Sequence, residues 1–203
     1  NRLGVWTKIK RNEKPDDKKC VKTKWVFKIK RDGKFRARLV ACRYSQIPGV
    51  DFNKSYAPVI SNIGYQTLLL LSLKKERMVY LIDVETLFLH GNLDEEIFME
   101  CPEGMEHQPD EIVKLKKSIY GLVQAARQYH KKWTEVLVSQ LGFKQSVADP
   151  CLYSRQNELY IGMYVDDNVV VGSQRAIEHF IKEIKDVGLN VTANKGVKDY
   201  LSC

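Results

Sequence analysis

The sequence predicts an α+β fold, in which an antiparallel sheet is backed by helices, and three observations support this prediction. Short apolar runs typical of strands alternate with longer stretches in which apolar residues recur with helical spacing. Turn signals such as Asp32-Gly33 separate neighbouring strand-like runs. The 203 residues are 44% hydrophobic and 29% charged, a composition typical of a globular chain with a buried core. Strands joined in hairpins and covered by helices are the arrangement that these patterns favour.

The first predicted element is a basic hairpin. Residues 24–42 alternate apolar and basic side chains on both sides of Asp32-Gly33, which is a strong signal for two paired strands. Because side chains alternate between the two faces of a strand, basic side chains are expected together on one face. They are Lys28, Lys30, Arg36 and Arg38.

The positive charge of the chain is concentrated around this hairpin. Residues 1–54 contain 17 Lys and Arg against 5 Asp and Glu, whereas residues 55–203 contain 16 against 20. Basic and aromatic side chains together suit a polyanion with stackable bases, so a nucleic acid partner is favoured. A merely solvated basic face is the alternative. The accompanying aromatic residues are Trp6, Trp25, Phe27, Phe35 and Tyr44.

A helix and two strands are predicted next along the chain. Ser61 is a good N-cap for a helix through the apolar stretch that follows it. Residues 78–83 have the composition of a buried strand, and this strand ends at Asp83. Residues 92–110 predict a short hairpin around Pro102 and a polar loop, and residues 111–117 predict a short strand.

The second half of the chain adds two helices and a further hairpin. Residues 123–141 predict an amphipathic helix. Residues 151–172 predict a hairpin whose tip carries Asp166 and Asp167, and a last helix is expected at about residues 174–187.

Three aspartates can meet in the predicted sheet. The strand that ends at Asp83 and the hairpin tip at Asp166 and Asp167 can lie side by side. Taken alone, an Asp-Asp-Asn step is an ordinary turn signal. Three converging carboxylates repel one another unless cations neutralise them. Two divalent ions about 3.5–4 Å apart catalyse in-line phosphoryl transfer, which a polymerase and a two-metal nuclease both use.

Other classes of site are not indicated. The five cysteines contain no CxxC pair and are odd in number, which argues against a zinc ribbon and a disulfide framework. The four histidines have no metal-ligand spacing such as HExxH. No run approaches the roughly 18 apolar residues of a membrane span, and the first ten residues do not resemble a signal peptide. An intracellular protein is therefore expected.

Six segments form an ordered series over nearly the whole chain. They read WVFKIKRDG at 25–33, DVETLFLHG at 83–91, LDEEIFM at 93–99, SIYGL at 118–122, ADPCLY at 148–153 and YVDD at 164–167. In this series the chain resembles the reverse transcriptase of copia-type long-terminal-repeat retrotransposons. The YVDD box alone would be weak evidence, whereas the ordered series is specific.

The resemblance implies the fingers and palm of a right-handed polymerase. Residues 1–60 correspond to a fingers lobe with the basic hairpin. Residues 61–203 correspond to the palm, with part of the fingers inserted around residues 92–135. The thumb and ribonuclease H domains of the family are expected to lie beyond the counterpart of this chain.

The resemblance also implies a catalytic centre. Asp83, Asp166 and Asp167 correspond to the three catalytic carboxylates, and these residues together with Val84 correspond to the metal-binding positions. Phe88 occupies the position of an aromatic gate that rejects a 2′-hydroxyl by excluded volume.

Further positions correspond to substrate contacts. Lys30, Arg36 and Arg38 lie where the family grips the triphosphate. Gln124 lies where a glutamine borders the nascent base pair. The implied nucleic acid contacts are Lys28 and Tyr164.

The implied activity is RNA-directed DNA polymerisation with two Mg²⁺ ions, for which Mn²⁺ can substitute. The implied partners are an RNA or DNA template with its primer, deoxynucleoside triphosphates, and the remainder of a Pol polyprotein with thumb, ribonuclease H and integrase. No membrane partner is expected, and the family's setting is a cytoplasmic virus-like particle. Leu87, where the family usually has alanine, is expected to crowd the nucleotide. It favours the alternative of a catalytically inactive remnant that keeps the fold and nucleic acid binding.

Overall fold

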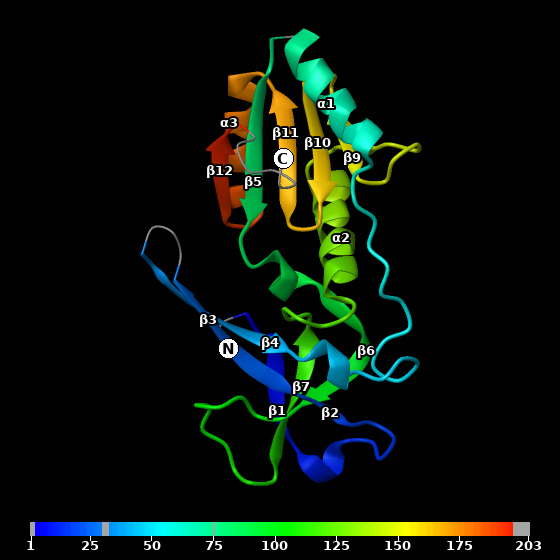
Figure 1. The fold of residues 1–203 in the computed structure, drawn as a ribbon, viewed down its shortest axis with the longest axis vertical. Helices are drawn as coiled ribbons and strands as arrows, with labels where there is room; N and C mark the ends of the chain where they lie inside the picture. Colours follow the sequence, from blue (N-terminus) through cyan, green and yellow to red (C-terminus); the bar gives the residue numbers. More distant parts are fainter. Residues whose placement is uncertain (1–2, 30–32, 75, 197–203) are drawn as a thin grey trace. The chain divides into compact units, whose positions relative to one another are not determined.

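The computed structural model describes residues 3–29, 33–74 and 76–196 of the protein, and the chain divides into two compact units (Figure 1). The first unit contains residues 1–56 and 88–128, and the second contains residues 57–87 and 129–203. Two elements contain residues of both units. They are the 3-10 helix η3 (Leu87–His90) and helix α2 (Ala125–Glu135).

The first unit contains a four-stranded sheet and a separate two-stranded hairpin. The sheet has the strand order β1-β7-β6-β2, and the hairpin pairs β3 with β4. The bounds are β1 Trp6–Lys10, β2 Cys20–Val21, β3 Thr23–Ile29, β4 Phe35–Ala41, β6 Asn92–Met99 and β7 Glu111–Lys117, with short 3-10 helices at Arg11–Glu13 (η1) and Arg43–Ser45 (η2).

The predicted basic hairpin is confirmed. The hairpin predicted around Pro102 is longer in the structure than the short one expected within residues 92–110, because its two strands are β6 and β7. β3 and β4 pair antiparallel from Thr23 opposite Ala41 to Ile29 opposite Phe35. β6 begins at Asn92, and an irregularity in its pairing with β7 separates Asn92 from Ile97. Three acidic residues, Asp94, Glu95 and Glu96, lie between them. They fit a strand because exposed and half-buried positions alternate there.

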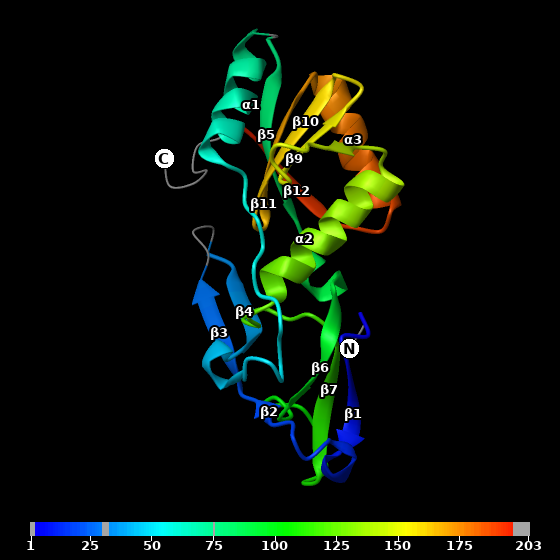
Figure 2. The ribbon, with the colours of Figure 1, turned by 90° about the vertical axis from the view of Figure 1, so that its right-hand side faces the viewer.

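The second unit contains a six-stranded antiparallel sheet with the order β12-β5-β11-β10-β9-β8 (Figure 1). Helix α1 packs on one face of this sheet and helix α3 on the other (Figure 2). The bounds are α1 Asn62–Lys74, β5 Met78–Val84, β8 Lys144–Gln145, β9 Leu152–Arg155, β10 Leu159–Tyr164, β11 Asp167–Gly172, α3 Gln174–Asp186 and β12 Val191–Lys195, with a π-helical turn at Val136–Gln140 (η4) after α2.

The predicted hairpin at 151–172 is a meander of three strands, because a turn at Gln156–Asn157 divides its first arm into β9 and β10. The two residues of that turn both have positive φ, at 52° and 53°. β11 forms the centre of the core, since Val169, Val170 and Val171 are all fully buried.

The predicted helices α1 and α3 are confirmed, and both begin at serine. The Ser61 hydroxyl accepts a hydrogen bond from the Gly64 amide at 3.0 Å, and the Ser173 hydroxyl accepts one from the Ala176 amide at 3.2 Å. Such caps satisfy amides that have no partner inside the helix. No helix in the described ranges is long and apolar enough to cross a membrane.

Candidate functional site

The second unit brings the three predicted aspartates to one end of its sheet. β5 and β11 are antiparallel neighbours, and their register sets Asp83 directly opposite Asp167. Directly opposed residues have Cβ atoms about 4.5–5.5 Å apart. Asp166 precedes Asp167 and is the second residue of the two-residue turn between β10 and β11. Asp83 and Asp167, which are 84 positions apart in the sequence, are therefore neighbours.

The turn that carries Asp166 has an unfavourable backbone. Its first residue, Val165, has φ of 53°. Positive φ at the first turn position alone is the pattern of a type II′ turn, where glycine is the usual residue. A β-branched residue in this region is strained, and such strain is found preferentially at functional sites.

The carboxylates of this turn and of β5 repel one another. The pKa of Asp167 is raised, first because burial desolvates its carboxyl group and then because of the charges of Asp166 and Asp83. The residue still keeps enough exposed surface for an ion to reach it, as does Asp83. The charged forms are thus held together at an energetic cost that a cation would relieve.

The donor set fits a hard divalent cation, because carboxylate oxygens are the ligands that Mg²⁺ prefers. Within the described ranges, however, no three side chains of His, Cys, Asp or Glu are arranged to hold a metal ion. The three carboxylates would have to turn toward one another to share an ion.

Val84 and Tyr164 lie at the ends of the strands that carry these aspartates. Val84 is the last residue of β5, is buried, and pairs with Val191 of β12. Tyr164 is the last residue of β10, lies opposite Asp167, and is 37% exposed. Its ring is therefore accessible.

The hairpin of the first unit has one basic and one aromatic face. Lys28 lies opposite Arg36, and Arg38 lies on the same face opposite Val26. The alternation places the other side chains on the reverse face, where Phe27 is 75% and Phe35 is 87% exposed. Lys30 lies outside the described residues.

Arg38 and Phe88 are linked within the first unit through Tyr120. The Arg38 guanidinium lies 4.4 Å from the centre of the Tyr120 ring, a cation–π contact. The Phe88 ring is 4.8 Å from the Tyr120 ring, centre to centre. Phe88 is only 7% exposed and Leu87 is fully buried, so Leu87 offers no exposed surface to crowd a nucleotide.

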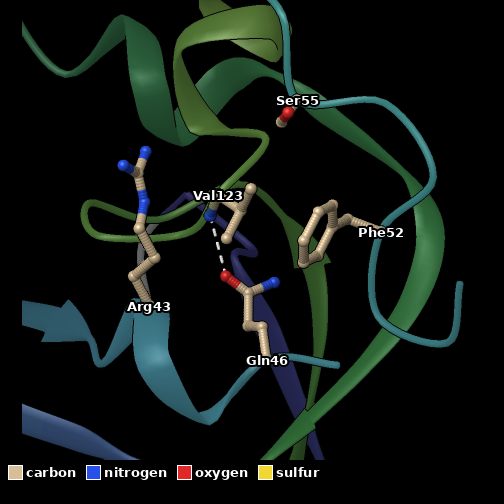
Figure 3. A pocket seen from close by; sticks show the side chains of 5 residues that line it. All are labelled: Arg43, Gln46, Phe52, Ser55 and Val123. Carbon is tan, nitrogen blue, oxygen red and sulfur yellow. Dashed lines mark hydrogen bonds between the residues drawn. The ribbon is translucent and has the colours of Figure 1, made fainter. Parts of the chain in front are cut away.

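Gln124 is fully buried in the first unit. Its side-chain amide donates to the Asp51 carbonyl at 2.9 Å, and its side-chain oxygen accepts from the Gln46 amide at 3.1 Å. The Gln46 side-chain oxygen in turn accepts from the Val123 backbone amide at 2.7 Å (Figure 3). These bonds give Gln124 a structural role, and its contact with a nucleotide stays a prediction.

A pocket of about 510 Å³ adjoins this glutamine pair. In Figure 3 the side chain of Arg43 lies to the left and that of Phe52 to the right, with Gln46 and Val123 between them. None of the residues predicted as site residues lines it. The lining residues are Arg43, Gln46, Phe52, Ser55 and Val123.

Sequence reasoning missed the residues that surround the aspartate turn from the other face of the sheet. Tyr129 and Trp133 of α2 and Asn168 of β11 are all fully buried. A signal was present, because Asn168 is a polar residue at the head of a run of buried valines.

Comparison with known proteins identifies similar sequences. Residues 4–202 match the family model described as reverse transcriptase (RNA-dependent DNA polymerase). The retrovirus-related Pol polyprotein from transposon TNT 1-94 of Nicotiana tabacum is 38% identical over 194 residues, which cover 87% of this chain and 14% of that protein. The corresponding polyprotein from transposon RE2 of Arabidopsis thaliana is 32% identical over 173 residues, which cover 80% of this chain and 12% of that protein. The transposon Ty1-DR4 Gag-Pol polyprotein of Saccharomyces cerevisiae is 26% identical over 155 residues, or 76% of this chain and 10% of that protein. The chain thus spans a small part of the length of these relatives.

Proposed function

Because the chain belongs to the reverse transcriptase (RNA-dependent DNA polymerase) family, we propose that it extends a primer on a nucleic acid template by adding deoxynucleotides. The observation that supports this proposal most directly is the register that sets Asp83 opposite Asp167, with Asp166 in the adjoining turn. In two-metal phosphoryl transfer, carboxylates gathered at one place hold the ions.

In the proposed reaction, the 3′-hydroxyl of the primer attacks the α-phosphate of a deoxynucleoside triphosphate. A phosphodiester bond forms and pyrophosphate leaves. Asp83, Asp166 and Asp167 would hold two Mg²⁺ ions, which when bound stabilise the charge that develops on the attacking and leaving oxygens. The contribution of the chain is to deliver these carboxylates on two paired strands and a short turn, from which they would turn toward one another to share the ions.

The proposed substrate contacts lie in the first unit. The basic face of the hairpin, with Lys28, Arg36 and Arg38, would bind triphosphate and nucleic acid backbone. Its aromatic face would stack with bases. Phe88 would exclude the 2′-hydroxyl of a ribonucleotide, and Tyr164 of the second unit would contact the primer.

The proposed setting is a longer Pol polyprotein. The similar proteins are Pol and Gag-Pol polyproteins, of which this chain corresponds to 14% or less. In this proposal the first unit acts as fingers and the second as palm, and thumb, ribonuclease H and integrase are supplied by other parts of the polyprotein. Reverse transcription would take place in a cytoplasmic particle.

The test is primer extension on a homopolymer template with Mg²⁺, comparing the parent chain with Asp166→Asn. Asparagine keeps the shape of aspartate but removes the charge, so we expect the extension rate to fall at least about 100-fold. Asp186→Asn is the matched control, because Asp186 is an exposed carboxylate at the end of α3 and its loss should leave the rate unchanged.

Two outcomes would contradict the proposal. If Asp166→Asn extends primers at the parent rate, the carboxylates are not catalytic. If the parent chain binds oligonucleotides tightly but extends no primer with Mg²⁺ or Mn²⁺, the inactive remnant is the better description.

A further inference from the structure

A buried polar cluster lies directly behind the turn that carries Asp166. It consists of Asn168 of β11 and of Tyr129 and Trp133 of α2, and is called the Asn168 cluster below. All three residues belong to the second unit and are fully buried. Because side chains alternate along β11, Asn168 points to the face of the sheet opposite that of Asp167.

The hydrogen bonds of the Asn168 cluster run in one direction and end at the turn. The Trp133 indole N–H donates to the Asn168 side-chain oxygen at 2.7 Å. The Asn168 side-chain amide lies 3.3 Å from the Tyr129 hydroxyl oxygen, which accepts from it. The Tyr129 hydroxyl donates to the Asp166 carbonyl oxygen at 3.2 Å.

The Asn168 amide also reaches two backbone carbonyls directly. It lies 3.2 Å from the Asp166 carbonyl oxygen and 3.2 Å from that of Ile82. Ile82 precedes Asp83 on β5, so a single side chain is bonded to the backbone beside two of the three aspartates. An asparagine amide has two protons and can serve these acceptors in shared bonds.

A cluster of this kind is costly unless it is fully bonded, because a buried amide or indole N–H without a partner costs about 1–3 kcal/mol. Here every side-chain polar group of the three residues has a partner. Satisfied buried networks are rigid and select one arrangement of the chain. The neighbouring turn needs such a constraint, since Val165 has a left-handed φ of 53° that its β-branched side chain disfavours.

We propose that Asn168, supported by Trp133 and Tyr129, is a positioning residue that fixes the Asp166 carbonyl and thereby aims the carboxylates of Asp166 and Asp167 at the metal site. This inference rests on the proposed function, because it assigns Asn168 a role at the same carboxylates. Asn168 acts through the backbone of Asp166 and Ile82 and contacts neither substrate nor metal.

The test measures the dissociation constant of Mn²⁺ by electron paramagnetic resonance on the full chain. Asn168→Leu has a side chain of similar size without polar atoms, and we expect it to weaken Mn²⁺ binding about 10-fold or more, as loss of a group that orients a metal ligand does. Trp133→Phe removes the indole donor together with part of the buried ring, and should weaken binding to a smaller extent in the same direction.

Tyr153→Phe is the matched control. Tyr153 is a buried tyrosine of the same unit whose hydroxyl lies 2.7 Å from the Thr134 hydroxyl and 3.3 Å from the Gln145 side-chain nitrogen, neither of which belongs to the Asn168 cluster. The variant loses the two side-chain hydrogen bonds of a buried aromatic residue outside the Asn168 cluster, and should change the Mn²⁺ dissociation constant less than twofold.

The double variant Asn168→Leu/Trp133→Phe separates positioning from stability. It removes the indole donor and its acceptor together, so its loss of folding free energy should be smaller than the sum of the losses in the two single variants. Mn²⁺ binding should stay weak, because the Asp166 carbonyl keeps only the Tyr129 bond. Mn²⁺ binding by the double variant as tight as that of the parent would overturn the positioning role.

The remaining outcomes distinguish the two proposals. If Asp166→Asn loses Mn²⁺ binding while Asn168→Leu and Trp133→Phe bind like the parent, the positioning role is wrong and the proposed function stands. If Asp166→Asn binds Mn²⁺ like the parent, the proposed function itself fails, and the inference fails with it. If Asn168→Leu does not fold, the Mn²⁺ dissociation constants of Trp133→Phe and Tyr153→Phe are compared instead. Equal changes in these two variants would overturn the inference.

Discussion

The carboxyl group of Asp167 makes the stability of the chain depend on pH. Burial and the charges of Asp166 and Asp83 raise its pKa above the ordinary value of 3.8. A carboxyl group whose pKa is raised by folding holds its proton more tightly in the folded state, so its ionisation destabilises the fold. This loss of folding free energy begins as the pH rises through the pKa of Asp167 in the unfolded state. It is complete above the pKa of Asp167 in the folded state. At lower pH both states are protonated and the effect is absent.

Replacement of Asp167 by asparagine should therefore stabilise the protein in a pH-dependent way. We expect Asp167→Asn to raise the free energy of unfolding relative to the parent at about pH 7, and to have little effect at about pH 3. Urea unfolding of both proteins at the two pH values measures this. A gain of equal size at both would mean that packing, and not charge, is the cause.

The size of the Phe88 ring is expected to determine sugar selection. Phe88→Val removes ring volume, and we expect the ratio of ribonucleotide to deoxynucleotide incorporation to rise about 10-fold or more. Competition assays with matched nucleotide pairs measure the ratio. Phe98→Val is the control, because Phe98 is a buried phenylalanine of the same unit and its loss should lower stability without changing the ratio. An unchanged ratio in an active Phe88→Val variant would make Phe88 a core residue only.

For single residues, the sequence revealed the carboxylates but not the side chains that hold them in place. Asp83, Asp166 and Asp167 could be found because each stands at the end of an apolar run. The partners of Asn168 could not, because they come from β5, the turn and α2. For Gln124 the sequence indicated a nucleotide contact and no structural role. Its position in a family motif gave no sign that its side chain is hydrogen-bonded to Asp51 and Gln46.

Among the elements, the β3–β4 hairpin is the one whose charge can be tested separately. Lys28 and Arg36 lie opposite each other on its basic face. We expect the variant Lys28→Gln/Arg36→Gln to bind a single-stranded oligonucleotide more weakly. The slope of log K against log salt should also become shallower, by about 0.7 for each lost phosphate contact.

The control for this experiment removes the same charges elsewhere. Lys182 and Arg175 are exposed residues of α3, so Lys182→Gln/Arg175→Gln has the same net charge as the hairpin variant. Its salt slope should equal that of the parent. Equal slopes in all three proteins would show that the hairpin is a solvated basic face.

Elements with local signals were predictable, and those that depend on distant partners were not. α1, α3 and the β3–β4 hairpin each have their capping serine or turn glycine in the adjoining sequence. β1 and β12 were missed, because β1 pairs with β7 about a hundred residues later and β12 pairs with β5. Neither strand has a run of apolar residues that would distinguish it from a loop.

For the whole molecule, metal binding should be linked to folding of the second unit. An ion that binds only the folded state stabilises it by about 2.7 kcal/mol at 100 times its dissociation constant. Trp133 belongs to the second unit, whereas Trp6 and Trp25 belong to the first. Fluorescence of a Trp6→Phe/Trp25→Phe chain therefore reports on the second unit.

We expect Mg²⁺ to raise the melting temperature of that chain by several degrees, since about 1 kcal/mol corresponds to roughly 2–4 °C at this size. The rise should vanish with Asp166→Asn. A rise that persists in Asp166→Asn would mean that Mg²⁺ binds elsewhere.

The two faces of the β3–β4 hairpin also affect how the protein behaves in concentrated solution. Within the described residues neither strand of this hairpin pairs with a third strand, and its reverse face exposes Phe27, Ile29 and Phe35. Open strand edges with exposed aromatic residues are templates for intermolecular β-sheet and hence for aggregation. The lysines and arginines interleaved with them act as gatekeepers, because like charges keep two such hairpins apart. Neutralising the basic face, by mutation or by a polyanion too short to cover the aromatic face, should therefore promote self-association of the chain.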